Sequence, residues 1–324
     1  MTSKRLFRAL MIFLLATIPG IAIAQANFPE RPITLIIPFA AGSAIENVGR
    51  VVAQGMSERL GQPVVVVNRP GAATKVGTGA FLRAPRDGYT MLLLVPANAV
   101  NIPALSETPP FDTLRDMTLL SKLVHINYTL VVHPSVPAKT LVDLVAYAKA
   151  NPGKLTYGSS GPASATHLTF ETFAHAAGIK LTHVPYKGEP LALTDLLGGR
   201  IDMMFVTITG KQHVDSGKLR ALATRGTTRY EPFKDVPTFE EVGVKGLSTT
   251  VWVGLATSKG VPQPIVAKLW QAMAASLKDE SVRAKLTGSG FVVVSQSPSE
   301  FEREVREEID QVHALGKRIN LKLQ

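Results

Sequence analysis

Strand-like and helix-like segments alternate along two separate parts of the chain, and this alternation limits the possible folds most strongly. In the first part, a buried-type strand at Ile33–Ile37 precedes apolar residues at helical spacing over residues 48–60. Four consecutive valines follow at 64–67, and then a short helix over 76–83 and a strand over 89–95. Strands separated by helices form parallel sheets with right-handed crossovers. The sequence therefore predicts an α/β protein.

The alternation resumes after residue 140. Strands are expected at 155–158, 181–184, 201–205 and 219–223, and helices at 164–177, 190–197 and near Gln212. The end of the chain adds a strand at 249–256, a long helix at 264–277, a strand at 291–294 and a helix headed by the capping box Ser297–Glu300. At 324 residues the chain is long enough for two units. We expect one lobe from residues 25–125 with 226–324, and a second lobe from 126–225.

The first residues have the pattern of a secretory signal peptide. Lys4, Arg5 and Arg8 precede a nearly continuous apolar run over residues 9–23, which ends in Ala22-Ile23-Ala24. The apolar run is too short for a membrane span and ends in small residues. We predict a signal peptide at residues 1–24, with cleavage after Ala26 as the alternative, and a mature protein in the periplasm.

Composition narrows the classes of function. The chain has no cysteine, which removes disulfides, thiolate metal sites and cysteine nucleophiles. Its formal charge is +10, and loss of the three basic signal residues, with no acid before Ala24, leaves +7. The positive residues are scattered and form no basic stripe, so nucleic-acid binding is not expected, although a positive field would help to gather small anions.

The motifs of several enzyme and cofactor sites are missing. Gly77-Thr78-Gly79 lacks the third glycine of a dinucleotide fingerprint, and no phosphate-binding loop or His-Glu-x-x-His sequence occurs. Residues 158–161 lack the spacing of a serine nucleophile elbow. We therefore predict no cofactor, no metal and no catalytic residue.

The segment over residues 157–167, Tyr-Gly-Ser-Ser-Gly-Pro-Ala-Ser-Ala-Thr-His, reads as a strand end, a tight loop and a helix start. Glycines allow close backbone approach, and the first turn of a helix leaves backbone N–H groups without intrahelical partners. Together with the helix dipole, those donors suit a carboxylate. The alternative is an ordinary strand-to-helix turn with an N-cap.

Several short motifs, in order and spacing, resemble the Bug family of extracytoplasmic solute-binding receptors of tripartite tricarboxylate transporters. They include Arg31-Pro32-Ile33, Pro38-Phe39-Ala40-Ala41-Gly42, the stretch from Leu60-Gly61-Gln62-Pro63 to Asn68-Arg69-Pro70-Gly71-Ala72, Asp87-Gly88-Tyr89-Thr90, Tyr157-Gly158-Ser159-Ser160-Gly161 with His167, His183-Val184-Pro185-Tyr186-Lys187-Gly188, and Asp195-Leu196-Leu197-Gly198-Gly199. The match covers nearly the whole mature chain.

The resemblance implies a two-lobed type 2 periplasmic binding protein fold, each lobe a mostly parallel sheet flanked by helices. It implies a small organic acid as ligand and membrane transporter subunits as partners. We also expect the protein to be a monomer. In the family, the loops that match residues 38–46 and 158–167 face each other across the cleft and hold carboxylates through backbone amides. A receptor that reports to a signalling partner and, more remotely, an enzyme acting on a small acid are the alternatives.

The resemblance and the loop chemistry together give the expected ligand-binding residues. They are Phe39, Ala40, Ala41, Ser43, Glu46, Asn98, Ser159, Ser160, Gly161, Ala163, Ser164, Thr166, His167, Lys187 and Thr207. Five of them have a structural alternative: Phe39 in the core, Glu46 as a helix cap, Asn98 in a turn, His167 as a packed ring and Lys187 as a surface lysine. For Glu46 and Lys187 we prefer the alternative.

The chain departs from the family pattern at three positions. Ser43 stands where the family usually has glycine, Glu46 where it usually has aspartate, and Val206 where it often has aspartate. The segment over residues 94–101 is also unusual. Without an acid at Val206, a natural partner for an amino group is missing, so the sequence argues against an amino acid and in favour of a more apolar acid.

Overall fold

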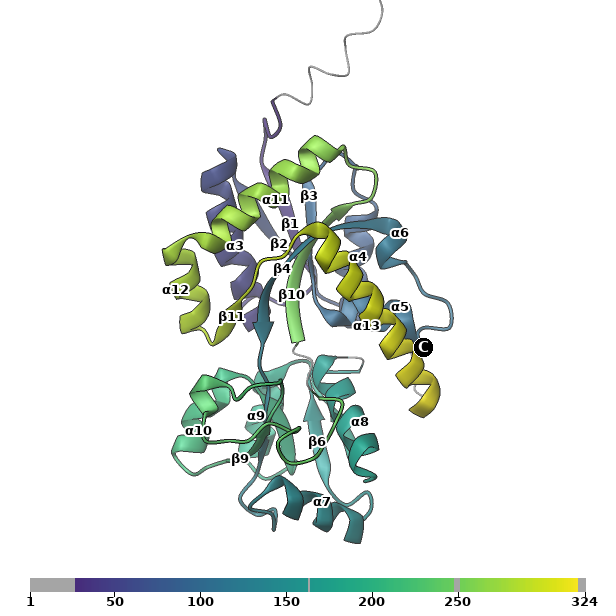
Figure 1. The fold of residues 1–324 in the computed structure, drawn as a ribbon, viewed down its shortest axis with the longest axis vertical. Helices are drawn as coiled ribbons and strands as arrows, with labels where there is room; N and C mark the ends of the chain where they lie inside the picture. The colour runs from purple at the N-terminus through teal and green to yellow at the C-terminus, as the bar shows by residue number, and fades with distance from the viewer. Residues whose placement is uncertain (1–26, 163, 248–250, 320–324) are drawn as a thin grey trace, which may run out of the picture.

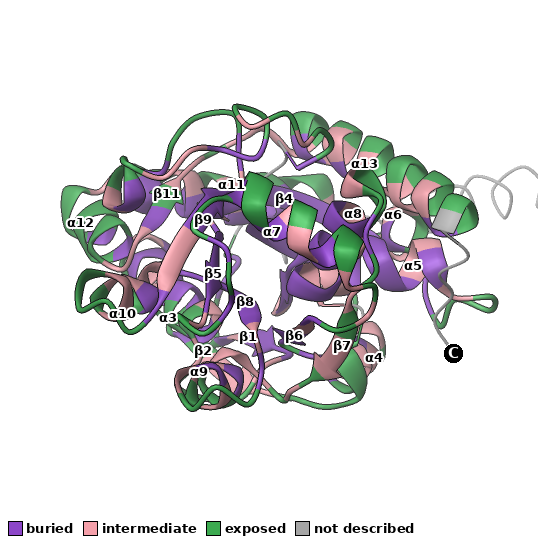
Figure 2. Ribbon diagram, turned by 90° about the horizontal axis from the view of Figure 1, so that it is seen from below, coloured by how far each residue is buried: buried purple, intermediate pink, exposed green. Residues whose placement is uncertain are grey.

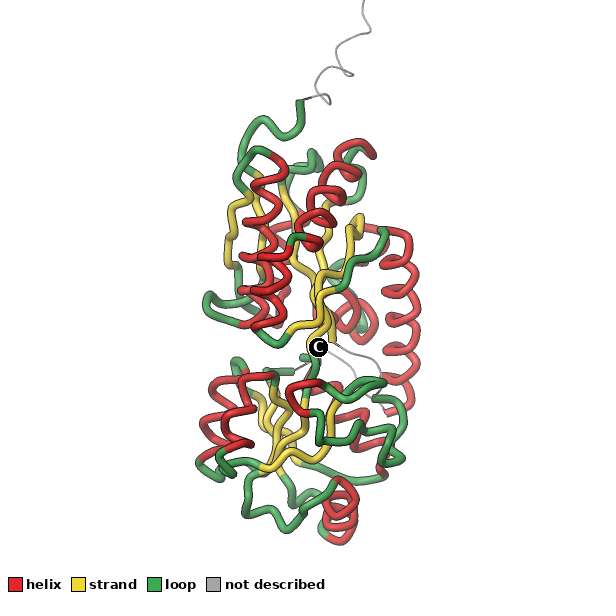
Figure 3. Tube along the Cα trace, turned by 60° about the vertical axis from the view of Figure 1, so that its left-hand side comes forward, coloured by secondary structure: helices red, strands yellow, loops and turns green. Residues whose placement is uncertain are grey.

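Two sheets, each covered by helices, form two lobes in the computed structural model, which describes residues 27–162, 164–247 and 251–319. The predicted signal peptide lies outside the described residues. Figure 1 shows the lobes one above the other, and Figure 3 shows the strands of each lobe enclosed by helices. The α/β, two-lobed fold class is therefore confirmed.

The first sheet has six strands in the order β11-β4-β10-β3-β1-β2. Its strands are β1 (Ile33–Ile37), β2 (Val64–Asn68), β3 (Thr90–Leu94), β4 (Met117–Ile126), β10 (Val251–Ser258) and β11 (Phe291–Val293). Its helices are α3 (Ala44–Leu60), α4 (Lys75–Leu82), α5 (Ile102–Leu105), α6 (Thr113–Asp116), α11 (Gln263–Lys278), α12 (Glu280–Gly288) and α13 (Pro298–Ile319), with a 3₁₀ turn η1 (Ala72–Thr74) and a π turn η2 (Ala97–Asn101).

The second sheet has five strands in the order β7-β6-β8-β5-β9. Its strands are β5 (Thr129–Val132), β6 (Thr156–Ser159), β7 (Thr182–Pro185), β8 (Met203–Val206) and β9 (Arg220–Thr224). The accompanying helices are α7 (Leu141–Ala150), α8 (Ala165–Ala177), α9 (Glu189–Leu197) and α10 (Lys211–Asp215), with 3₁₀ turns η3 (Ile208–Gly210) and η4 (Glu231–Phe233).

Local sequence signals fix several of these boundaries. Ser164 caps α8 by accepting a hydrogen bond from the His167 amide, and Gly178 ends that helix in the left-handed conformation. Thr140 and Asp143 form the reciprocal capping box that begins α7. The helix α12, which periodicity alone had not predicted, begins at the cap Asp279.

Both sheets are mixed, rather than mostly parallel as expected. β1 pairs in parallel with β2 and β3, and β6 with β7 and β8, whereas β10 pairs antiparallel with β3 and β4, and β5 antiparallel with β8 and β9. The reason is topological. β4 leaves the first lobe and β10 returns to it, so the two strands run in opposite directions (Figure 1).

These directions determine which strand ends meet. β3 runs antiparallel to β10 and therefore points toward the second lobe, as do its parallel neighbours β1 and β2. β5 starts at the crossing from the first lobe, so its antiparallel partner β8 points back toward that lobe, together with β6 and β7. The carboxyl ends of the parallel strands in both lobes thus face each other.

The chain between β9 and β10 packs against the second lobe. Phe239 contacts Phe173 and Phe205, with ring centroids 5.4 and 5.9 Å away, and the Phe239 amide donates to Thr224. The expected lobe boundary at residue 226 precedes this segment. The same segment also reaches the first lobe, since the Tyr230 hydroxyl donates to the Gly290 carbonyl at 2.6 Å.

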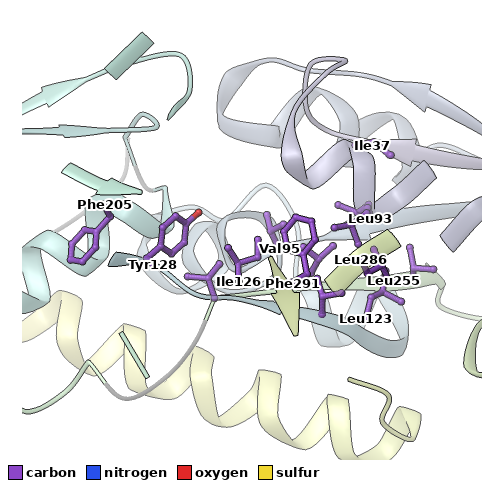
Figure 4. Packing of buried hydrophobic residues seen from close by; sticks show 14 of the residues in the cluster. Ile37, Leu93, Val95, Leu123, Ile126, Tyr128, Phe205, Leu255, Leu286 and Phe291 are labelled. Atoms are coloured by element: carbon purple, nitrogen blue, oxygen red, sulfur yellow. The ribbon is translucent and has the colours of Figure 1, made fainter. Parts of the chain in front are cut away.

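One apolar core continues through the joint between the lobes. Figure 4 shows Phe205 and Tyr128 on one side and Ile126, Phe291 and Leu123 on the other, in one cluster. Figure 2 shows the buried strands surrounded by helices whose outer faces are exposed. The lobes are therefore joined by packed side chains as well as by the chain itself.

The substitution Gly254→Ala tests the packing of α13 on the hinge strand β10. A Cβ atom at Gly254 would lie 2.6 Å from Phe301 Cζ and 3.0 Å from the Ser121 carbonyl oxygen. We expect a loss of about 1–3 kcal/mol in the free energy of unfolding, measured by chemical denaturation. Gly288→Ala, where a Cβ meets nothing within 4 Å, is the matched control and should have little effect. Equal effects of both substitutions would contradict this packing.

Candidate functional site

The first of the facing loops begins helix α3 with most of its polar groups already engaged. Ser43 caps the helix, since its Oγ accepts from the Glu46 amide at 3.1 Å. The buried Glu46 carboxylate accepts from the Gly42 amide at 3.2 Å and from Arg50. Glu46 therefore serves as a helix cap and ion-pair partner in this structure, in agreement with the preferred interpretation.

The preceding residues of this loop are more open. Phe39 is half-buried against the main core, and its carbonyl accepts from Asn68 Nδ2 at 2.9 Å. Ala40 and Ala41 are exposed. Within the described residues, the amides of Ala44 and Ile45 in the first turn of α3 donate to no acceptor. The loop thus retains backbone donors at a helix start, the arrangement that suits an anion.

Asn98 does not have the position expected of a ligand contact. It is fully buried, and its Oδ1 accepts from the Val95 amide at 2.8 Å. Its Nδ2 donates to the Leu93 carbonyl at 3.3 Å and lies 3.5 Å from Thr78 Oγ1. Asn98 lies in the π turn η2, and its side chain hydrogen-bonds to the backbone at the end of β3. Because the side chain is fully buried, Asn98 presents no atom to the second lobe.

The second facing loop is internally hydrogen-bonded. Thr166 Oγ1 accepts from the Ser160 amide at 3.0 Å and lies 3.1 Å from Ser164 Oγ. Ser159 Oγ accepts from the Gly161 amide at 3.1 Å. Ser159 and Thr166 are buried, whereas Ser160 is exposed. The buried hydroxyls therefore hold the loop in shape, and Ser160 is the serine that remains accessible.

Two further features complete this loop. Gly161 has φ +117°, which other residues rarely adopt, and a Cβ there would lie 3.3 Å from the Tyr186 carbonyl. The amides of Ala165 and Thr166 have no acceptor within the described residues, as at the start of α3. The predicted site residue Ala163 lies outside the described residues.

A stack of aromatic rings packs against the loop over residues 158–167. His167 and His183 lie face to face with centroids 4.1 Å apart, and His183 also stacks on Tyr157 at 4.9 Å. His183 Nε2 is 2.7 Å from Ser159 Oγ. Burial, and secondarily the neighbouring His167, lowers the pKa of His183 to about 4, and burial also lowers the pKa of His167. Both rings are thus neutral near pH 7, and His167 is a packed, positioning residue.

The remaining predicted residues lie at the ends of β7 and β8. Lys187 is exposed and forms no ion pair with the described residues. Thr207 is buried, and both its amide and its Oγ1 donate to Glu189 Oε1 at 3.2 Å. Sequence reasoning missed Glu189. The only local signal was an acid at the first position of α9, which reads as an ordinary helix start.

A cavity of about 240 Å³ also lies between the lobes, beside α13. It is lined by Arg225, Thr169 and other residues of α8 from the second lobe, and by Glu308 and later turns of α13 from the first. Arg225 donates to Thr169 at 2.5 Å, and Glu308 accepts from Trp252 at 2.8 Å. None of the predicted site residues that the structure describes lines this cavity. We assign it to the joint between the lobes, because Arg225 and Glu308 already bond to the chain.

Within residues 27–162, 164–247 and 251–319, no group of three or more His, Asp or Glu side chains could hold a metal ion. The same residues contain no helix long and apolar enough to cross a bilayer.

The two-lobed fold with facing loops at the strand ends is that of a periplasmic solute-binding protein. Within that class, the chain belongs to the tripartite tricarboxylate transporter family receptors, whose profile matches residues 48–321. It is 37% identical over 307 residues to a UPF0065 protein from the gbd 5′ region of Cupriavidus necator, covering 93% of this chain and 92% of that one. It is 31% identical to the protein BugT of Bordetella pertussis, covering 95% of both. The resemblance to the Bug family is thus confirmed.

Solved structures agree. A Rhodopseudomonas palustris protein with adipate superposes with a TM-score of 0.83 at 31% identity, covering 91% of this chain and 99% of that one. The protein MatC of the same organism, with bound malate, superposes with a TM-score of 0.80 at 28% identity, covering 89% and 99%.

The neutral His183 predicts a specific dependence of stability on pH. Because its folded pKa lies below the unfolded value, the unfolded chain takes up a proton first, and stability falls as the pH drops from 6.5 toward about 4. We expect the melting temperature of the wild type to fall more between about pH 7 and about pH 5 than that of His183→Asn. The same decrease in both proteins would show that His183 is not linked to folding.

Proposed function

We propose that this protein is a periplasmic solute-binding receptor that captures a small carboxylate between its lobes and delivers it to a tripartite tricarboxylate-type transporter. The observation that carries the proposal is that two capped helix starts, α3 and α8, lie at the strand ends by which the two lobes face each other. Each start retains two backbone amides without an acceptor among the described residues. Such amides, at the positive end of a helix dipole, bind carboxylates without any chemical step.

Binding in this scheme is a closure of the lobes. Each lobe supplies half of the donors, so that both halves reach the ligand only when the lobes come together and exclude water. Charge-assisted hydrogen bonds are stronger than neutral ones, and a micromolar affinity needs about −8 kcal/mol net. One chain contains both halves, so a monomer is sufficient. We also propose that residues 1–24 direct export and are removed.

The neighbours support a carboxylate as ligand, since one was solved with adipate and another with malate. A receptor that passes its signal to a sensor instead of a transporter would use the same binding site. An enzyme would require a reactive group that a ligand can reach. The Ser159 hydroxyl lies 2.7 Å from His183 Nε2, but it is buried, as is the Thr166 hydroxyl, which accepts from the Ser160 amide. We therefore keep transport as the proposal.

A screen of organic acids tests the proposed ligand class. A ligand that binds only the folded state raises the melting temperature, so at least one small carboxylate should do so. Replacing the exposed Ser160 by Trp should weaken binding of that acid about tenfold or more, which corresponds to about 1.4 kcal/mol, because the ring obstructs closure. Ser216→Trp, at the exposed end of α10, is the control and should bind as the wild type does.

If amines or sugars raise the melting temperature and no carboxylate does, the proposed ligand class is wrong. If Ser160→Trp binds the acid with unchanged affinity, the second facing loop is not part of the site.

A further inference from the structure

The half-buried carboxylate of Glu189 has one oxygen engaged and one without a partner. Its Oε1 accepts from the Thr207 amide, from Thr207 Oγ1 and from Thr209 Oγ1, the last at 2.5 Å. Within the described residues, no group donates to Oε2. Since Glu189 begins α9 and Thr207 follows β8, this carboxylate lies at the end of the second sheet that faces the first lobe.

A second unpartnered group lies beside it. Thr129 pairs with Val206, so Tyr128 stands opposite Thr207 at the same sheet end. Tyr128 is 8% exposed, and its hydroxyl forms no hydrogen bond with a described residue. In Figure 4 this hydroxyl points away from Phe205, toward the first sheet. Burial, and secondarily the charge of Glu189, raises the pKa of Tyr128, so the hydroxyl remains a neutral donor.

Resting on the function proposed above, we propose that Glu189 and Tyr128 form a subsite for a hydrogen-bond-donating substituent of the ligand. The ligand is then a carboxylic acid that also carries an ammonium or hydroxyl group, rather than an unsubstituted dicarboxylate. The free oxygen of Glu189 accepts from the substituent. The Tyr128 hydroxyl donates to a hydroxyl substituent or to an adjacent carboxylate oxygen.

This inference changes the expectation drawn from Val206. That residue is fully buried among Ala192 and Leu196, and it does not line the interface between the lobes. An acid is nevertheless present at the same strand end. Glu189, at the start of α9, accepts a hydrogen bond from the amide of Thr207, the residue that follows Val206. The negative charge that the sequence comparison found missing at position 206 is therefore supplied by a neighbouring element.

A purely structural role explains only half of this arrangement. A carboxylate at the start of a helix is favourable, and the Oε1 contacts tie η3 to α9. Yet burial raises the pKa of Glu189, which means that the fold bears a cost for holding it charged near neutral pH. A glutamine would keep the Oε1 contacts without that cost. A carboxylate that is held against desolvation, with one oxygen unpartnered, is typical of a binding site.

Matched acids that differ only in one substituent test the subsite in the full-length mature protein. Succinate, malate and aspartate form one such series, and adipate, 2-hydroxyadipate and 2-aminoadipate form a longer one. We expect a substituted acid to bind about tenfold or more tightly than the plain acid of the same length in at least one series, measured by calorimetry. In Glu189→Gln the preference for the ammonium acid should disappear, and the plain acid should bind as well as or better than it binds to the wild type.

Two controls separate binding from folding. Glu240→Gln removes an exposed carboxylate elsewhere in the second lobe and should leave the preference unchanged. Apo Glu189→Gln should melt at the same temperature as the wild type or higher near neutral pH, because a charge held against desolvation has been removed.

The outcomes distinguish this inference from the proposed function. If plain dicarboxylates bind as tightly as substituted ones at both lengths, and Glu189→Gln changes neither, the subsite is refuted while carboxylate binding stands. If no acid of either kind binds to any variant, the proposed function is refuted together with the subsite.

Discussion

The antiparallel pairing of β4 with β10 is the constraint on which the rest of the structure depends. The pairing extends from Ile126 with Val251 to Met117 with Ser258, and it combines the strand that leaves the first lobe with the strand that returns. Reversing either strand would turn the ends of β1 and β3 away from the second lobe. Where the chain passes between the lobes, the segment before β5 is joined to the segment after β9 by a hydrogen bond of 2.8 Å from the Arg225 amide to the Tyr128 carbonyl. The facing loops are thus a consequence of strand direction.

The facing loops differ in how their polar groups are used. In the loop before α3, the Glu46 carboxylate accepts from the Gly42 amide. In the loop before α8, the hydroxyl groups of Thr166 and Ser159 accept from the amides of Ser160 and Gly161. Both loops are therefore fixed before any ligand arrives. The aromatic stack of Tyr157, His183 and His167 adds to this rigidity. Loops that are already ordered lose little conformational freedom on binding, which favours affinity.

The sequence predicted what local chemistry decides. The strand at Ile33–Ile37 and the helix expected over residues 164–177 follow from hydrophobic pattern and helix-end signals. The structure has that strand at those residues, and it has α8 at Ala165–Ala177, with Ser164 as its cap. The mixed sheets could not be read in this way, because the partner of β10 is set by the return of the chain from the other lobe.

The candidate site shows the same division. The importance of the loop over residues 157–167 was visible in its glycines and hydroxyls. The burial of Asn98 was not, since it depends on the π turn η2. Glu189 was missed because its partner Thr207 is 18 positions away along the chain. Contacts of that separation leave no pattern in a single sequence.

The helix α13 has a consequence for the way in which the lobes can separate. It begins on the first lobe, where Phe301 packs on Gly254, and its later turns line the cavity shared with α8 of the second lobe (Figure 1). Opening on that side would expose more of the half-buried side chains of Val312 and Leu315, whereas opening at the facing loops would not. We therefore expect the lobes to rotate about an axis near the helix, with the largest movement at the facing loops. If the lobes rotate about one axis only, the open protein has few relative orientations of its lobes. Most of these orientations can then close directly onto a ligand.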